Sequence, residues 1–213
     1  MSNKESFIKQ IDYFSKYYRV IAPDLTGFGE NLKLNKCYSL DDYVLDVLNL
    51  INSLNIKKYH VLAHSFGGRI AIKLATIDNR IDKIIFTGSA GLKPKRSPIY
   101  YFRVYLYKFL KKVFKNKDFS FLGSKEYQSL TQIERVSYVK VVNEHLDNLL
   151  CKITNETLII HGIKDTATPK YMAKRLRKGI KNSRLHFISG NHFCFLFNSD
   201  LFNLYMHNFL KGV

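Results

Sequence analysis

The sequence predicts an α/β fold, with a mostly parallel sheet that carries helices on both faces. Short β-branched segments alternate with amphipathic helical segments along nearly the whole chain, which is the pattern of such a sheet. The alternation is interrupted only once, by a long segment near the middle of the chain. The chain has 213 residues, of which 46% are hydrophobic, enough for one globular core.

The expected elements follow from apolar spacing. Helical spacing predicts helices at Glu5–Lys16, at Leu40–Leu54 with Ser39 as N-cap, after Phe66 as far as Ala75, from about Thr168-Pro169, and at Ser199–Leu210. In the helix near Pro169, proline is expected in the first turn. Short β-branched runs predict strands at Tyr18–Ala22, Tyr59–Ala63, Lys83–Phe86, Thr157–Ile160 and Arg184–Ile188.

The interruption covers residues 91–153 and is rich in helix formers, aromatic residues and lysine. We interpret it as an inserted helical cap, which leaves residues 1–90 and 154–213 as the core. No acidic residue occurs from position 93 to position 117, and the basic residues there are Lys93, Lys95, Arg96, Arg103, Lys108, Lys111, Lys112, Lys115 and Lys117. Two interpretations are open: a lid that contacts an anionic membrane surface or attracts an acidic substrate, or a cap whose aromatic residues cover the pocket.

The net charge of +17 would attract anions of several kinds. Lysine is spread along nearly the whole chain, so no nucleic-acid partner is expected. No apolar segment is long enough to span a membrane and no secretory signal is visible, which predicts a cytoplasmic protein. The three cysteines, Cys37, Cys151 and Cys194, lack metal-ligand spacing and are expected to be reduced.

A serine stands where a strand ends in the segment Val61-Leu62-Ala63-His64-Ser65-Phe66-Gly67-Gly68-Arg69. Small residues two positions to either side of Ser65 suit a sharp turn from strand to helix, where a bulky side chain would clash. Such a turn exposes Oγ near the positive N-terminus of the following helix. The motif makes Ser65 a candidate nucleophile.

Two further strands end in groups that could serve this serine. Asp165 follows the strand Thr157–Ile160, and His192 follows the strand Arg184–Ile188. Because parallel strands present their carboxyl ends at one edge of the sheet, the three side chains should meet there. The chain order Ser, Asp, His is that expected of a catalytic triad on such a sheet.

Other polar residues are expected to be structural. His64 should pack at the turn, and His60, His161 and His186 lie in or beside strands. Asp24 should serve as a cap or form loop hydrogen bonds, whereas Asp78 and Asp82 precede the strand Lys83–Phe86 and belong to the opposite edge of the sheet. None of these residues is assigned a chemical role.

With these motifs the chain resembles the α/β-hydrolase superfamily, in the branch of capped esterases, enol-lactonases and meta-cleavage-product hydrolases. The segment Ile21-Ala22-Pro23-Asp24-Leu25-Thr26-Gly27-Phe28-Gly29 is similar to the family's glycine loop beside the pocket. The resemblance implies that Ser65 forms an acyl-enzyme with a small-molecule substrate, that His192 transfers the protons and that Asp165 orients His192. It implies no metal or organic cofactor.

The family pattern also implies an oxyanion site with two backbone N–H groups, one of them from Phe66. The other comes from a His-Gly loop ahead of the first helix, and this sequence begins inside that helix. In the family's order a strand lies between those expected at Tyr18–Ala22 and Tyr59–Ala63. We therefore expect an N-terminally truncated hydrolase with unpaired strands. The alternative is a weakly active or non-catalytic protein of the same fold.

Overall fold

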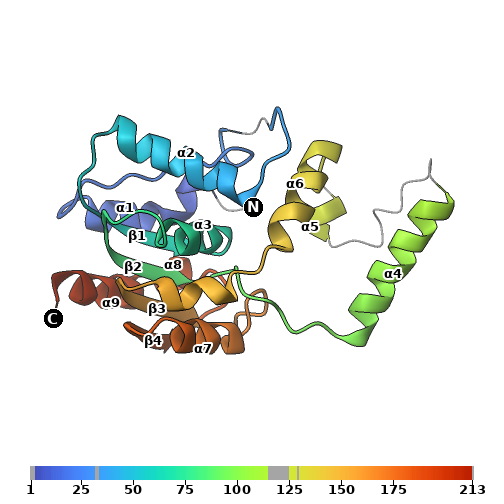
Figure 1. Ribbon diagram of the computed structural model, residues 1–213. Coiled ribbons are helices and arrows are strands. Elements are labelled where there is room, and N and C mark those ends of the chain that lie inside the picture. Colours follow the sequence, from blue (N-terminus) through green and yellow to red (C-terminus); the bar gives the residue numbers. More distant parts are fainter. Residues whose placement is uncertain (1–2, 32–33, 115–124, 129, 213) are drawn as a thin grey trace.

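The computed structural model describes residues 3–31, 34–114, 125–128 and 130–212. It contains a four-stranded sheet in which all neighbouring strands are parallel and follow one another in chain order (Figure 1). The strands are β1 (Tyr59–His64), β2 (Ile81–Thr87), β3 (Glu156–Gly162) and β4 (Ser183–Ile188). These four strands and the α/β fold class are confirmed.

Helices cover both faces of this sheet, as predicted (Figure 1). One face carries α2 (Leu40–Ser53), α3 (Phe66–Leu74) and α7 (Lys170–Gly179). The other carries η1 (Lys4–Phe7), α1 (Ile8–Phe14), α8 (Cys194–Phe197) and α9 (Ser199–Lys211). None of the described helices is long and apolar enough to cross a bilayer.

The side-chain alternation of the strands divides the apolar residues between two cores. Ile84 and Phe86 of β2 belong to the cluster with α2, α3 and α7, whereas Ile85 between them belongs to the cluster with α1, α8 and α9. This alternation follows from the two-residue period of a strand. The two central strands, β2 and β3, are therefore largely buried on both faces, which explains their apolar runs.

Helix boundaries follow local chemistry. Ser39 is the N-cap of α2, and its side chain accepts a hydrogen bond from the N–H of Asp42 while Asp42 bonds back to Ser39. This capping box confirms the predicted start of α2. The prediction for α7 is wrong by one residue, because Pro169 is extended, with ψ 156°, and forms the N-cap ahead of the first turn.

The strand predicted at Tyr18–Ala22 is not formed. The segment pairs with no described strand, and Val20 and Ile21 are 37% and 39% exposed. Its β-branched residues favour an extended chain, but a strand also needs a neighbour to complete its hydrogen bonds. The segment and β1 line a common cleft, so no other described strand lies between them.

The edge of β1 that faces this cleft is open. Tyr59 and Ser65 donate their N–H groups toward β2, to Arg80 O at 3.1 Å and Thr87 O at 3.2 Å. The ladder alternates, so the N–H groups of Leu62 and His64 point to the other side, where no described strand is paired with β1. The expectation of an unpaired strand therefore applies to β1, while Tyr18–Ala22 forms no strand.

The segment from 91 to 153 leaves the sheet after β2 and contains α4 (Pro98–Val113), α5 (Lys125–Gln128), α6 (Gln132–Val142) and η3 (Asp147–Lys152). Its two ends meet where Leu146 N donates to Gly91 O at 2.8 Å. Leu146 and Leu150 lie in the core cluster with α3 and α7. In contrast, α4 extends away from the sheet (Figure 1). Lys115 and Lys117 lie outside the described residues.

Candidate active site

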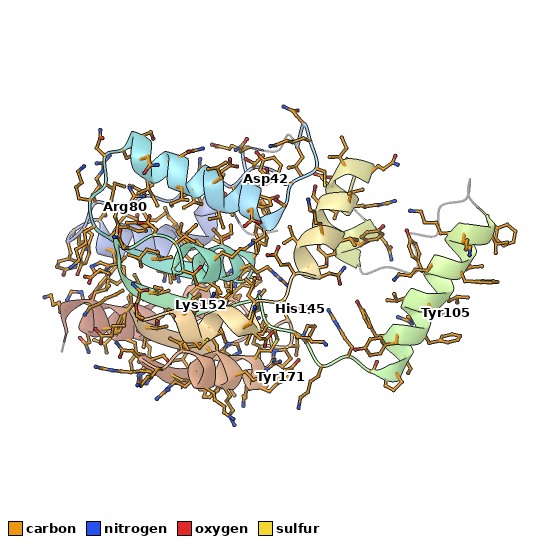
Figure 2. The ribbon with its side chains drawn as sticks, in the orientation of Figure 1. Asp42, Arg80, Tyr105, His145, Lys152 and Tyr171 are labelled. Atoms are coloured by element: carbon orange, nitrogen blue, oxygen red, sulfur yellow. The ribbon has the colours of Figure 1, made fainter. Side chains whose placement is uncertain are left out.

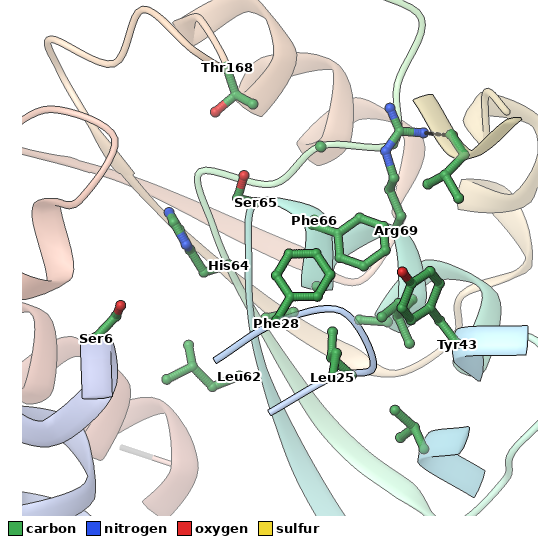
Figure 3. A pocket seen from close by; sticks show the side chains of 18 of the residues that line it. Ser6, Leu25, Phe28, Tyr43, Leu62, His64, Ser65, Phe66, Arg69 and Thr168 are labelled. Atoms are coloured by element: carbon green, nitrogen blue, oxygen red, sulfur yellow. Dashed lines mark hydrogen bonds between the residues drawn. The ribbon is translucent and has the colours of Figure 1, made fainter. Parts of the chain in front are cut away.

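Ser65 lies on the turn between β1 and α3, half-buried at the carboxyl end of the sheet (Figure 3). Its backbone has φ 50° and ψ −113°, a conformation that a residue with a side chain rarely adopts. The carbonyl of Ser65 accepts from Gly68 N at 3.0 Å and from Ala90 N at 2.9 Å, which holds the turn. The expected sharp turn is therefore present, and it places the serine at the N-terminus of α3.

Gly68 is required by a close contact with a loop that is distant in the sequence. A Cβ atom on Gly68 would lie 2.8 Å from Ser89 Cβ and 3.2 Å from its Cα, whereas one on Gly67 would meet no atom within 4 Å. The close approach is therefore between α3 and the loop after β2. The spacing around the serine does not identify this contact, because its partner, Ser89, is distant in the chain.

Asp165 and His192 are joined by a hydrogen bond of 2.9 Å between Asp165 Oδ2 and His192 Nδ1. Asp165 is buried and also accepts from Thr168, through its N–H at 2.9 Å and its hydroxyl at 2.8 Å. Burial alone would raise the pKa of Asp165, but the hydrogen bonds from His192 and Thr168 lower it to about 2. The carboxylate is therefore charged at neutral pH and fixes the orientation of the imidazole.

Two glycines that the sequence analysis did not single out make room for this pair. A Cβ atom on Gly88, which has φ +52°, would lie 2.9 Å from His192 Nδ1. A Cβ atom on Gly162 would lie 2.8 Å from Gly190 O in the loop before His192. Gly88 directly follows β2, and Gly162 is the last residue of β3. A glycine at the end of a strand is therefore the sequence signal that could have identified them.

The histidine and the serine are close to each other without a hydrogen bond in this structure. His192 lines the same cleft as Ser65, and the ring of His64, the residue before Ser65, lies 4.5 Å from the ring of His192 between centroids. The structure forms no hydrogen bond between Ser65 Oγ and His192. In unliganded enzymes catalytic hydrogen bonds are often long and shorten when substrate binds.

His64 supports the histidine loop. Its Nε2 lies 3.0 Å from His192 O, and its ring packs on Phe195 with centroids 4.8 Å apart. Burial, together with repulsion from His192, lowers the pKa of His64 to about 4. A neutral, packed histidine is what the sequence analysis expected at this position.

Phe66 is the first residue of α3, so its N–H has no acceptor within the helix. Its ring stacks on Phe28 of the glycine loop, with centroids 5.4 Å apart, and lies edge-on to Tyr43 (Figure 3). The loop itself turns at Gly27 and Gly29, both with positive φ as expected. These rings form an aromatic wall beside Ser65 and leave the N–H of Phe66 at the start of α3 available.

The rival carboxylates are engaged elsewhere. Asp24 accepts from Lys4 N at 2.8 Å and Glu30 N at 3.2 Å, which confirms its role in the loop. Asp78 accepts hydrogen bonds from Tyr59 and Arg80 at the starts of β1 and β2, at the edge of the sheet opposite Ser65. His161 is buried, with Nε2 3.7 Å from Asp165 Oδ2.

A cleft of about 2110 Å³ opens above these residues. Small-molecule sites usually measure roughly 300–1,000 Å³. The cleft is larger because its lining includes two groups of residues, one around Ser65, α4 and α6, and one from β1 and the segment 18–22. We take the part around Ser65 as the candidate substrate pocket.

Arg69, which the sequence analysis did not assign, connects this pocket to the cap segment. Its buried guanidinium donates to Val141 O at 3.1 Å, Val142 O at 3.3 Å and Glu144 O at 2.6 Å, at and just beyond the end of α6 (Figure 3). A cation at the C-terminal carbonyls of a helix both bonds them and opposes the helix dipole. One residue of α3 therefore fixes the end of α6 over the site.

A parallel sheet with a strained serine after β1 and an Asp–His pair after β3 and β4 defines a protein of the α/β-hydrolase class. The family model described as alpha/beta hydrolase fold matches residues 2–138, more than half of the chain, and the chain belongs to this family.

Relatives and solved structures agree with this membership. The human serine hydrolase BPHL is 27% identical over 207 residues, covering 92% of this chain and 70% of the human protein. The AB hydrolase superfamily protein YisY of Bacillus subtilis is 27% identical over 227 residues, covering 94% and 85%. A meta-cleavage product hydrolase from Pseudomonas fluorescens is 26% identical with a TM-score of 0.75, and the match covers 100% of this chain and 86% of that one.

An esterase from Exiguobacterium antarcticum shares the fold, with a TM-score of 0.78 at 22% identity and coverage of 99% and 88%. The resemblance inferred from the motifs is thus confirmed, and the relatives support a hydrolase.

Proposed function

We propose that the protein is a serine hydrolase that cleaves an ester or a related acyl bond of a small molecule through Ser65, His192 and Asp165. The observation that carries this proposal is the strained Ser65 at the start of α3, in one cleft with the His192–Asp165 pair. A positive φ on a serine at the mouth of a cleft costs stability and is typical of functional sites. The names of the relatives, a serine hydrolase and an esterase among them, support the same class.

The mechanism follows from the proton positions. The bond to Asp165 assigns the proton of His192 to Nδ1 and leaves Nε2 free to accept one. In the first step Ser65 Oγ attacks the carbonyl carbon, its proton moves to Nε2, and the N–H of Phe66 stabilises the oxyanion. The imidazolium then protonates the leaving group. In the second step His192 takes a proton from water, which attacks the acyl-enzyme, and Ser65 recovers its proton.

Ser65→Ala tests the assignment. With a short-chain p-nitrophenyl ester, we expect kcat to fall at least about 1000-fold, because the nucleophile and its general base act as a unit. Ser6→Ala is the matched control, since Ser6 lines the same cleft away from the turn (Figure 3) and should leave kcat unchanged. Equal activity of Ser65→Ala and wild type would contradict the proposal.

Two observations favour the alternative of a weakly active or non-catalytic protein. Ser65 and His192 share no hydrogen bond, and Phe66 is the one backbone donor that we assign to the oxyanion. Loss of one oxyanion donor typically costs about 100- to 1000-fold in rate. A folded wild-type chain that neither turns over esters nor reacts with a serine-directed fluorophosphonate would establish this alternative.

A further inference from the structure

The helix α4 contributes no residue to the core of the protein. None of its 16 residues is buried, although it contains eleven aromatic and aliphatic side chains besides Pro98. Its largest exposed apolar residues, with exposures from 53% to 71%, are Ile99, Tyr101, Phe102, Tyr105, Phe109 and Val113. Figure 2 shows Tyr105 on this helix, away from the sheet. Exposed apolar surface of this kind on a protein marks an interaction site.

The apolar residues form a stripe along one side of the helix. Ile99, Phe102, Leu106, Phe109 and Val113 recur at alternating intervals of three and four residues, so they lie on one face of α4. We call these five residues the outer stripe. The residues of α4 that line the cleft are instead Tyr100, Arg103, Val104, Tyr107 and Lys108. The outer stripe therefore faces away from the candidate site and does not cover it.

The inner side of α4 already has a neighbour. The hydroxyl of Tyr107 lies 3.3 Å from that of Tyr127 on α5, and the two rings meet edge to face. The cap interpretation, in which aromatic residues cover the pocket, thus accounts for Tyr100 and Tyr107 but leaves the outer stripe without a role.

The charges of α4 indicate what the outer stripe contacts. The helix has no acidic residue, and its cations are Arg103, Lys108, Lys111 and Lys112. No carboxylate of the described residues forms an ion pair with any of the four, although Lys111 lies 5.8 Å from the centroid of the Tyr107 ring. A second copy of α4 would bring like charges together. A polyanion in solution would engage the lysines and leave the outer stripe in water.

We propose that α4 docks the protein on an anionic lipid bilayer. The outer stripe enters the headgroup region, while the lysines lie on the other side of the helix and their long side chains reach back toward the lipid phosphates. An amphipathic helix with aromatic residues on one face and lysines on the other has the composition that binds such an interface. The docked helix would hold the cleft, lined by the opposite side of α4, next to the membrane surface.

Insertion can be read directly because the chain contains no tryptophan. Phe102→Trp places a single fluorophore in the outer stripe, and Ile77→Trp places one at a position of similar exposure, 63% against 65%, outside the cap segment. With vesicles of phosphatidylglycerol and phosphatidylcholine, emission of the first should shift to shorter wavelength and that of the second should not. An unshifted Phe102→Trp variant would contradict docking through the stripe.

Charge is tested by vesicle co-sedimentation of the full chain. Lys108→Gln/Lys111→Gln/Lys112→Gln should weaken binding about 100-fold, because each lysine near an anionic surface contributes roughly fivefold. The control Lys174→Gln/Arg177→Gln/Lys178→Gln removes three exposed cations from α7 and lowers the net charge equally. If both triple variants lose affinity alike, attraction is a property of net charge and the proposal is wrong.

The contribution of the outer stripe to vesicle binding is tested in the same assay. Phe102→Ser/Phe109→Ser should abolish sedimentation with anionic vesicles, while Ile77→Ser/Leu204→Ser, two exposed apolar residues elsewhere, should not. Wild-type binding to pure phosphatidylcholine that equals binding to anionic vesicles would contradict the role of charge. A dimer in light scattering that Phe102→Ser/Phe109→Ser dissociates would assign the outer stripe to self-association instead.

Discussion

The backbone conformation of Ser65 is stabilised by its neighbours in space. A non-glycine residue in this region costs about 1–3 kcal/mol, so the surrounding contacts must impose it. Ser65 N bonds to Thr87 O of β2, and Ser65 O accepts from Ala90 N in the loop that follows. The same loop contains Ser89, against which Gly68 packs. The turn is therefore fixed by the strand beside it as much as by its own sequence.

The two glycines after Ser65 should respond differently to alanine. Gly68→Ala places a methyl group against Ser89 and should lower the free energy of unfolding by about 1–3 kcal/mol. Gly67→Ala has open space and should be neutral or stabilising by up to about 1 kcal/mol, because alanine loses less backbone entropy. Urea unfolding of the pair measures this. Equal destabilisation by both substitutions would contradict the packing described for the turn.

His64 makes stability depend on pH. Its pKa falls from 6.5 to about 4 on folding, so between these values the unfolded chain binds more protons than the folded one. Above pH 6.5 the contribution of His64 to the free energy of unfolding should be fully present. As the pH falls toward 4, the free energy of unfolding should decrease by about 3 kcal/mol at most.

The substitution His64→Gln, which removes the titrating ring and keeps a side-chain donor, isolates this effect. Urea titrations of both proteins across that pH window should give a steeper loss of stability for wild type than for His64→Gln. Parallel curves would show that His64 does not titrate with the lowered pKa.

At the scale of elements, α3 links the sheet to the cap segment. Its first residues form the turn at Ser65, and Arg69, one turn later, bonds the carbonyls at the end of α6. A second link joins Tyr38 N to Ser137 Oγ of α6 at 2.9 Å. The position of α6 over the cleft thus depends on a few polar contacts, since only Ser137 and Val141 of its residues are buried.

Arg69→Met should therefore loosen α6 more than the sheet. The substitution keeps most of the buried apolar stem but removes the guanidinium bonds to three carbonyls, of which Val141 O keeps a bond from Glu144 N, at a cost of about 1–3 kcal/mol. Hydrogen exchange measured by mass spectrometry should become faster in peptides from α6, while peptides from β2 and β3 remain protected. Arg177→Met on the exposed side of α7 is the control and should leave exchange in α6 unchanged. Unaltered exchange in Arg69→Met would contradict the coupling.

For the whole molecule, local patterns predicted those elements whose partners are present. The β-branched runs at Tyr59–Ala63 and Lys83–Phe86 form strands because each has a neighbour to complete its hydrogen bonds. Tyr18–Ala22 carries the same kind of residues but pairs with no described strand. Strand propensity reports how well a side chain suits a sheet, whereas pairing depends on another segment, which a local pattern does not contain.

The candidate site shows the same division between local and distant causes. Ser65, Asp165 and His192 could be placed at one edge of the sheet because each follows a strand in the sequence. Arg69 could not be identified in this way, because its partners in α6 lie more than 70 residues away in the chain. The orientation of the outer stripe is likewise absent from the sequence pattern, which shows that α4 is amphipathic but not which side faces the cleft.

The role of Ser65 as nucleophile is tested most directly by covalent labelling. The folded wild-type chain is treated with a fluorophosphonate, and the modified residue is located by mass spectrometry of its peptides. We predict one adduct, on Ser65, that Ser65→Ala removes and Ser6→Ala retains, with slower labelling in Asp165→Asn because His192 loses its orientation. An adduct on another residue, or none on a folded chain, would contradict the proposed reaction.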